Sequence, residues 1–442
     1  MISSAIDHYI DQFQHLRKDL NGDKLQVQRQ SAIEHLQKNG FPSTRQENWK
    51  YTDVRPITGK SYNTATVNPE KISAKTVDNI RQHELECHEL VFINGRYSSA
   101  HSRLQSLPDG VVIQDLASAL NDHPHLIAEH LSGSSAEPNG FTALNTAFIR
   151  DGILVCLPPN AVIEKPLNLL YLSGLNDQPF ASHPRNIIIL SENSQATIIE
   201  TYIGLEDSNY FTNTVTMAHV QQNAHLQHYK IQQESVQAYH IGNFKIRQAQ
   251  NSQVESHSIS LGGALVRNDI HCRLEAEGAR ITMNGLYMAT GRQHIDNHTR
   301  VDHLQPHTSS YEIYRGVLND HARGVFNGKV IVHKDAQKTD AVQSNANLLL
   351  SDNAEVDTKP ELEIYADDVK CAHGATVGQL DQDMMFYLRS RSIDENTAKS
   401  LLTFAFADEV IRQIKLLPIR QQLENLVIGR LPEAELIRKF AV

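Results

Sequence analysis

The sequence predicts a mainly β protein, with a β-solenoid at its centre and helices at both ends. A small turn motif that begins with Asn or Gly recurs at residues 193, 223, 251 and 278, with starts 30, 28 and 27 residues apart. A period near 28 with one turn per unit is typical of a solenoid, because each coil buries its apolar face only against its neighbours. The alternative is a β-sandwich with chance spacing. The motif returns at residue 353 out of phase, so the coil length must vary.

Residues 1–87 are predicted to form an N-terminal helical domain. Tyr9, Phe13 and Leu16 follow one another at the three- to four-residue spacing of a helix face. A second helix is expected near residues 31–39, ending where Gly40 offers a left-handed cap.

Residues 88–378 are predicted to be the β-solenoid core, because short segments there alternate between apolar and other side chains. Helical periodicity returns in residues 379–442, which form the predicted C-terminal helical domain. Residues 392–395 have the pattern of a capping box that starts at Ser392. Leu402, Phe406 and Val410 then form an i, i+4 ridge. Apolar side chains on more than one face indicate that this helix contacts the core and a partner, and an ordinary buried helix is the alternative.

The most informative segment for function is residues 368–378, which contains Cys371, Ala372 and His373. Side chains alternate along a strand, so Cys371 and His373 would point to the same side. A thiolate beside an imidazole suits a soft or borderline metal such as iron, copper or zinc. The alternative is a buried cysteine next to a hydrogen-bonded histidine.

Composition excludes several classes of function. A net charge of −10 disfavours nucleic acid as the main partner, because phosphate binding needs a basic surface. The four cysteines lie far apart without a Cys-x-x-Cys motif, which argues against a disulfide framework and fits a reducing cytoplasm. No apolar run is long enough to cross a bilayer, so we expect a soluble cytoplasmic protein.

Two further motifs point to structure rather than chemistry. Residues 324–330 are similar to a phosphate-binding loop, but have one residue too few between the glycines, and Val330 stands where Ser or Thr would bind magnesium. We therefore expect no ATP binding by this chain. His294, His298, His303 and His307 are interleaved with acidic residues, which favours structural imidazole–carboxylate pairs in solenoid turns over transient metal contact.

The wider sequence resembles a known family. Residues 323–330, 337–351 and 359–364, followed by the Cys-Ala-His-Gly segment, occur in the order found in the SufB/SufD family of iron–sulfur cluster assembly scaffolds. The Ala-His-Gly form of the last segment, together with Gly40-Phe41-Pro42 and residues 47–52 near the start, resembles the SufD branch.

This resemblance implies a right-handed parallel β-helix and a scaffold that is not itself an enzyme. It implies pairing with SufB through the β-helix and docking of the ATPase SufC on the C-terminal helices. Cys371 and His373 would then lie at the SufB interface, where a nascent cluster is built and iron is bound transiently, with no stably bound cofactor. The isolated chain could also form a homodimer. The rival interpretations are a β-helix enzyme acting on polysaccharides and a purely structural solenoid.

Overall fold

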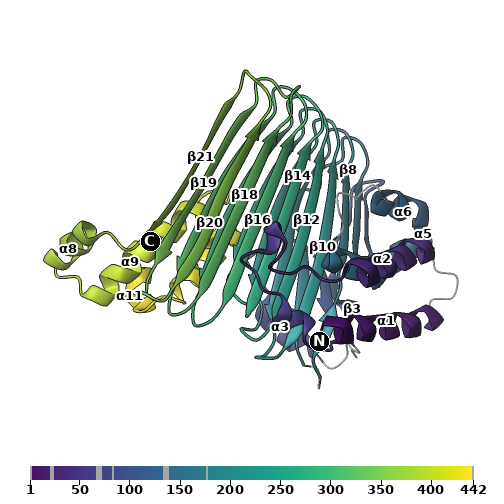
Figure 1. Cartoon of the computed structure of the whole chain (residues 1–442), viewed down its shortest axis with the longest axis horizontal. Coiled ribbons are helices and arrows are strands. Elements are labelled where there is room, and N and C mark those ends of the chain that lie inside the picture. The colour runs from purple at the N-terminus through teal and green to yellow at the C-terminus, as the bar shows by residue number, and fades with distance from the viewer. Residues whose placement is uncertain are drawn as a thin grey trace.

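The computed structural model describes residues 2–19, 24–65, 72–81, 84–132, 139–175 and 178–440, and it contains a long parallel β-solenoid of about eight turns (Figure 1). Two sheets face each other, and each coil contributes one strand to each sheet. The first sheet contains β5 (Gly152–Leu157), β8 (Arg185–Leu190), β10 (Tyr210–Val220), β12 (Tyr239–Gln248), β14 (Leu265–Leu274), β16 (His294–His303), β18 (Arg323–Val332) and β20 (Glu355–Ile364). The second contains β6 (Leu167–Ser173), β9 (Gln195–Gly204), β11 (His225–Gln233), β13 (Gln253–Ser260), β15 (Arg280–Ala289), β17 (Ser309–Leu318), β19 (Asp340–Leu349) and β21 (Lys370–Gly378). The predicted fold class, a parallel solenoid flanked by helices, is confirmed.

The turns explain the period in the sequence. Asn193, Asn223, Asn251 and Gly278 all adopt positive φ angles, of 60°, 55°, 54° and 72°, between a strand of the first sheet and the next strand of the second. Asn and Gly are the residues that tolerate this left-handed conformation. Residue 353 lies in the opposite turn, between β19 and β20, which is why its motif is out of phase. Because neighbouring coils pair in parallel through continuous ladders, the β-sandwich alternative is wrong.

The first coils are covered by elements that the sequence pattern did not predict. β2 (His88–Ile93) pairs with β6, and β3 (Arg96–Arg103) and β4 (Val112–Asp115) add antiparallel edges. Three helices interrupt the region that was predicted to contain only strands: α5 (Leu116–Asp122), α6 (Pro124–Ser132) and α7 (Gly140–Ala147). A short strand pair, β1 (Asn63–Thr64) with β7 (Phe180–Ser182), joins the first sheet.

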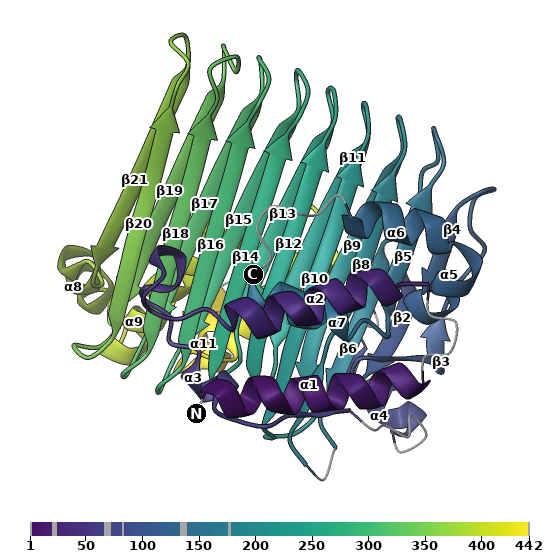
Figure 2. The same cartoon turned by 45° about the vertical axis from the view of Figure 1, so that its right-hand side comes forward.

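Most of the N-terminal helical elements pack on the outer face of the first sheet (Figure 2), whereas α4 (Ala74–Ile80) packs against β2 and β6 of the second sheet. The others are α1 (Ile2–Asp19), α2 (Gln26–Asn39), the 3₁₀ turn η1 (Glu47–Trp49) and α3 (Arg55–Thr58). As predicted, α2 ends at Asn39, but it begins at Gln26 rather than near residue 31, and Gly40 has a φ of 69° with a ψ of −169° instead of the ψ of a left-handed helical cap. Tyr9, Phe13 and Trp49 share one hydrophobic cluster with Phe141 of α7 and Phe211 of β10. The N-terminal helices are therefore held by the solenoid.

Three of the four C-terminal helices form one hydrophobic cluster with the outer face of the second sheet, and the first, α8 (Gln382–Ser390), contacts α9 (Glu395–Ile411). The other two are α10 (Leu417–Ile428) and α11 (Ala434–Phe440). Val410 and Leu423 join Tyr229 and Ile259 of the solenoid in one cluster. The N-cap of α9 is Asp394, whose side chain accepts a hydrogen bond from the backbone of Thr397, so the predicted capping box at Ser392 is wrong. No helix in the described ranges is long and apolar enough to span a membrane. The domain boundaries at 87/88 and 378/379 stay a prediction.

Candidate functional site

Cys371 and His373 lie on β21, the last strand of the second sheet. β21 pairs on one side with β19, where Cys371 is opposite Ala341 and His373 is opposite Gln343. No other described strand pairs with its second edge, and β20 is the corresponding end of the first sheet. Figure 2 shows this last coil at the opposite end of the solenoid from β4, α5 and α6. The last coil therefore presents open strand edges, the kind of surface on which another chain can add strands.

The thiol of Cys371 points into the last coil. Its side chain packs against a small apolar cluster that includes Val330 and Ala341, and it is half-buried. Burial raises the pKa of this thiol; the nearby carboxylate of Asp340 raises it further, and the backbone of Ala341 lowers it by less. Cys371 is thus a protonated thiol at neutral pH, and a nearby cation or metal would be needed to hold its thiolate.

His373 lies two residues further along the strand, so both side chains face the same side, as the alternation predicted. Its side chain is exposed, and it has no hydrogen-bond partner within the described part of the chain. An exposed imidazole without a partner can bind a metal or accept a proton once an approaching group fixes its orientation.

The comparisons with known proteins decide the family. The model of the family "SUF system FeS cluster assembly, SufBD core domain" matches residues 173–406, and that of the "SufBD protein N-terminal region" matches residues 3–169. The chain belongs to the SufBD family.

Several similar proteins are also described as iron–sulfur cluster assembly proteins. It is 32% identical over 410 residues to an iron–sulfur cluster assembly SufBD family protein of Synechocystis, covering 91% of this chain and 90% of the relative. It is 31% identical over 429 residues to the iron–sulfur cluster assembly protein SufD of Escherichia coli, covering 96% and 97%. SufD of Bacillus subtilis is 24% identical over 409 residues, covering 90% and 92%. The predicted SufB/SufD resemblance is confirmed, and this SufBD protein is an iron–sulfur cluster assembly protein of the SUF system.

Three of the four histidines that the sequence analysis singled out have side-chain partners, while His307 lies in a turn at a φ of 57°. His298 pairs with the Asp296 carboxylate at 3.0 Å, while His294 lies 2.9 Å from the Thr52 hydroxyl. His303 points into the solenoid, where it contacts the hydroxyls of Thr308 and Ser310. Only His298 has the predicted carboxylate partner, and it lies in a strand rather than a turn. In the described ranges, no three His, Cys, Asp or Glu side chains are grouped as a metal site.

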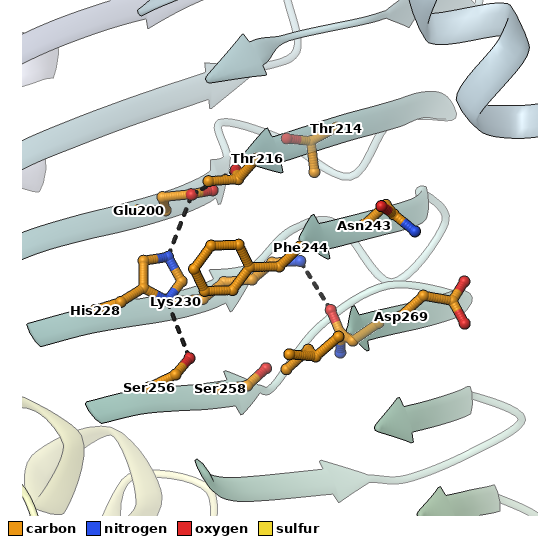
Figure 3. Close-up of a pocket in the computed structure, with 13 residues that line it drawn as sticks. Glu200, Thr214, Thr216, His228, Lys230, Asn243, Phe244, Ser256, Ser258 and Asp269 are labelled. Carbon is orange, nitrogen blue, oxygen red and sulfur yellow. Dashed lines mark hydrogen bonds and ion pairs between the residues drawn. The ribbon is translucent and has the colours of Figure 1, made fainter. Parts of the chain in front are cut away.

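Sequence reasoning missed a second cluster, inside the solenoid (Figure 3). His228 bridges Glu200, at 3.2 Å, and Ser256, at 3.1 Å, while Lys230 donates to Asn268 at 2.8 Å. Burial lowers the pKa of Lys230 to about 8, partly offset by acidic neighbours. The space between these side chains, about 20 Å³, has room for about one water molecule. The available signal was the coil period, since Glu200 is in register with Lys230 and His228 is in register with Ser256.

The C-terminal ridge is mostly covered in this SufBD chain. Val410 is fully buried, while Leu402 and Phe406 are half-buried, and the Arg315 guanidinium lies 6.0 Å from the Phe406 ring. The more exposed apolar side chains lie on α8, which projects from the body in Figure 1. Its Met384, Phe386 and Tyr387 are 56%, 75% and 58% exposed. The sequence analysis did not single out α8.

Proposed function

We propose that this chain is a SufD-like scaffold subunit of a cytoplasmic SUF complex, without enzymatic activity of its own. It pairs with SufB through the last coil of the solenoid and docks the ATPase SufC on its C-terminal helices. A nascent iron–sulfur cluster is then built at the SufB interface, next to Cys371 and His373. Iron and sulfide are cargo in this proposal, and neither a stable cofactor nor ATP binds this chain.

The observation that carries the proposal is the open last coil, with a thiol and an unpartnered imidazole on its edge strand. Strand edges attract further strands because their backbone groups need hydrogen bonds. SufB strands that extend the two sheets would bring a partner's ligands directly beside Cys371 and His373. The two side chains are too few for a complete iron site, which supports assembly at an interface over assembly on the isolated chain.

Docking of SufC has two candidate surfaces on the C-terminal helices. The predicted ridge offers Leu402 and Phe406, since Val410 is buried against the solenoid. The second is the set of exposed side chains on α8, Phe386 in particular, since α8 contacts α9. Aromatic and Met side chains on a projecting helix are typical of interface cores.

His373→Ala tests the cluster site. We expect the three-protein complex to form normally while cluster assembly is lost, because Ala supplies neither a ligand nor a proton acceptor. Cys371→Ser is expected to have a milder effect if SufB supplies the main sulfur ligand. The measurements are growth of a strain that depends on this pathway and co-purification of the three proteins. Normal growth of the His373→Ala strain would assign that histidine a structural role and contradict the proposal.

Single aspartate substitutions at Leu402, Phe406 and Phe386 test the docking surface. Loss of SufC in a pull-down, with unchanged circular dichroism, identifies the side chains that face the ATPase. A substitution that unfolds the protein instead assigns its side chain to the core. Unchanged SufC binding by all three variants contradicts docking on this surface.

A further inference from the structure

Three neighbouring strands of the second sheet each place one polar side chain in the same row, and this row ends at the open end of the solenoid. Glu312 of β17 is in register with Gln343 of β19, and Gln343 is in register with His373 of β21. Adjacent strands lie about 4.8 Å apart, so long side chains in one row reach their neighbours. Glu312 and Gln343 are each only 1% exposed, and His373 ends the row at the open coil.

The inner part of this row is incompletely hydrogen-bonded. Thr299 donates to Oε2 of Glu312 at 2.6 Å, but Oε1 of Glu312 and both amide atoms of Gln343 lack a partner within the described ranges. Gln343 approaches Glu312 closely enough to lower its pKa slightly, without reaching hydrogen-bond geometry. Buried polar atoms without partners are rare in folded proteins because each loses its bonds to water. The donor Nε2 of Gln343 and two acceptors, Oε1 of Gln343 and Oε1 of Glu312, are therefore unusual, and their lack of partners requires an explanation.

The opposite sheet leaves space for the Gln343 side chain. Gly328 of β18 faces it across the interior, and a Cβ at position 328 would lie 2.0 Å from Nε2 of Gln343. This glycine belongs to the segment with the spacing of an incomplete phosphate-binding loop, which forms a strand here. Gly328, the second glycine of that segment, is thus explained by the space that the Gln343 side chain occupies.

We propose that Gln343 is a positioning residue for His373, which deepens the proposed function and rests on it. Nε2 of Gln343 donates to Oε1 of Glu312, and Oε1 of Gln343 accepts the ring N–H of His373 when a partner covers the open coil. Small side-chain rotations would then give all three unpartnered atoms a hydrogen bond. The second ring nitrogen of His373 keeps its lone pair and faces the interface. Histidines that bind metals are commonly fixed in this way, through a hydrogen bond from the other ring nitrogen.

The test compares Gln343→Met with Gln343→Glu in the complex with SufB and SufC. Met matches the length of Gln and removes an unpaired buried amide, so we expect the melting temperature of the isolated chain to be unchanged or higher. Cluster assembly per complex is nevertheless expected to fall at least about tenfold, to the level of His373→Ala. Gln343→Glu buries a second carboxyl beside Glu312 and is expected to lower the melting temperature, yet it keeps an acceptor for His373 and more assembly than Met. If Gln343 serves only in packing, Gln343→Met keeps more cluster assembly than Gln343→Glu.

Two glycine variants provide an independent check. Gly328→Ala is expected to displace Gln343 and reduce assembly like Gln343→Met. Gly324→Ala lies on the same strand and faces Leu318 instead, with its Cβ 2.9 Å from Cδ1, so we expect it to keep assembly. Full assembly by Gln343→Met and Gly328→Ala, while His373→Ala has lost it, overturns the positioning role and leaves the proposed function standing. Full assembly by His373→Ala as well overturns both.

Discussion

Replacing Glu312 by Gln is expected to make the protein more stable at alkaline pH. Burial raises the pKa of Glu312 from 4.5 to about 7, against smaller opposing effects of Thr299 and Gln343. Between pH 4.5 and about 7 the folded state keeps Glu312 protonated while the unfolded chain releases the proton. The free energy of unfolding therefore has its full value below pH 4.5 and falls as the pH rises through about 7. At about 1.36 kcal/mol per pKa unit, the shift costs roughly 3 kcal/mol at pH 8 and about 1 kcal/mol at pH 5. A neutral Gln avoids this cost and still accepts the Thr299 hydroxyl.

Glu200→Gln is the matched control, because Glu200 lies in the same interior with the opposite shift. Burial raises the pKa of Glu200, but hydrogen bonds from His228, Thr216 and Tyr202 outweigh it and lower the pKa to about 2. Its stabilisation is present above pH 4.5 and lost as the pH falls through 2, so its replacement is expected to destabilise by roughly 3 kcal/mol at pH 8. Urea unfolding at pH 5 and pH 8, followed by far-ultraviolet circular dichroism, measures both variants. If Glu312→Gln is destabilised equally at both pH values, Glu312 is ionised and paired in solution, and the reasoning is refuted.

Three further results are expected. Arg267→Met removes a guanidinium that stacks on Trp49 and pairs with the buried Asp296 at 2.6 Å, so it should cost about 3–5 kcal/mol in urea unfolding; a loss below about 1 kcal/mol would mean that Asp296 finds another partner. Gly285→Ala places a Cβ 2.1 Å from the Tyr314 ring and should cost about 1–3 kcal/mol, or more if the ring cannot move; unchanged stability would mean that this coil repacks freely. The isolated protein should retain no iron–sulfur cluster after desalting and hydrolyse no ATP; a stoichiometric cluster, or turnover that survives removal of contaminating ATPases, would contradict the scaffold role.

The solenoid could be predicted because each of its turns has a short sequence motif that repeats with the coil. Asn223 and Asn251 occupy the left-handed positions where a coil changes sheets, and they repeat with the coil. The helices α5, α6 and α7 could not be predicted from this pattern, because they interrupt the first coils and replace the strand alternation only briefly.

The direction in which strand residues point was harder to predict. In β10, Val215 and Met217 alternate with Thr214 and Thr216, and every residue of this strand is buried. The apolar pair lies outside, under the helices, while the two threonines point inward to polar partners such as Glu200, which accepts from Thr216. Because helices cover the outer faces of both sheets, hydrophobicity alone does not distinguish inside from outside.

The same limit applies to the site. Cys371 and His373 are two residues apart, so strand alternation was enough to place them on one side. Glu312 and Gln343 precede His373 by two coils and one coil, and their common row depends on the register of the sheets. A shift of one residue in either ladder would have turned one of these side chains outward. No local pattern fixes that register, since the coil length varies.

Several buried polar atoms inside the solenoid lack a partner within the described residues, and Gln343, whose side chain carries two of them, is in register with a residue at the open end. Near Glu200 the carboxylate has a partner in His228, with Lys230 nearby, although Asn243 Oδ1 and Ser258 Oγ around the same space lack a hydrogen bond within the described residues. At Gln343 the partners are missing, and the next residue in the row is the exposed His373 on an edge strand. An apolar side chain at position 343 would remove an unpaired buried amide without removing any hydrogen bond that the described chain makes. The proposed hydrogen bond to His373, formed when a partner closes the last coil, gives this buried amide a role that an apolar side chain could not fill.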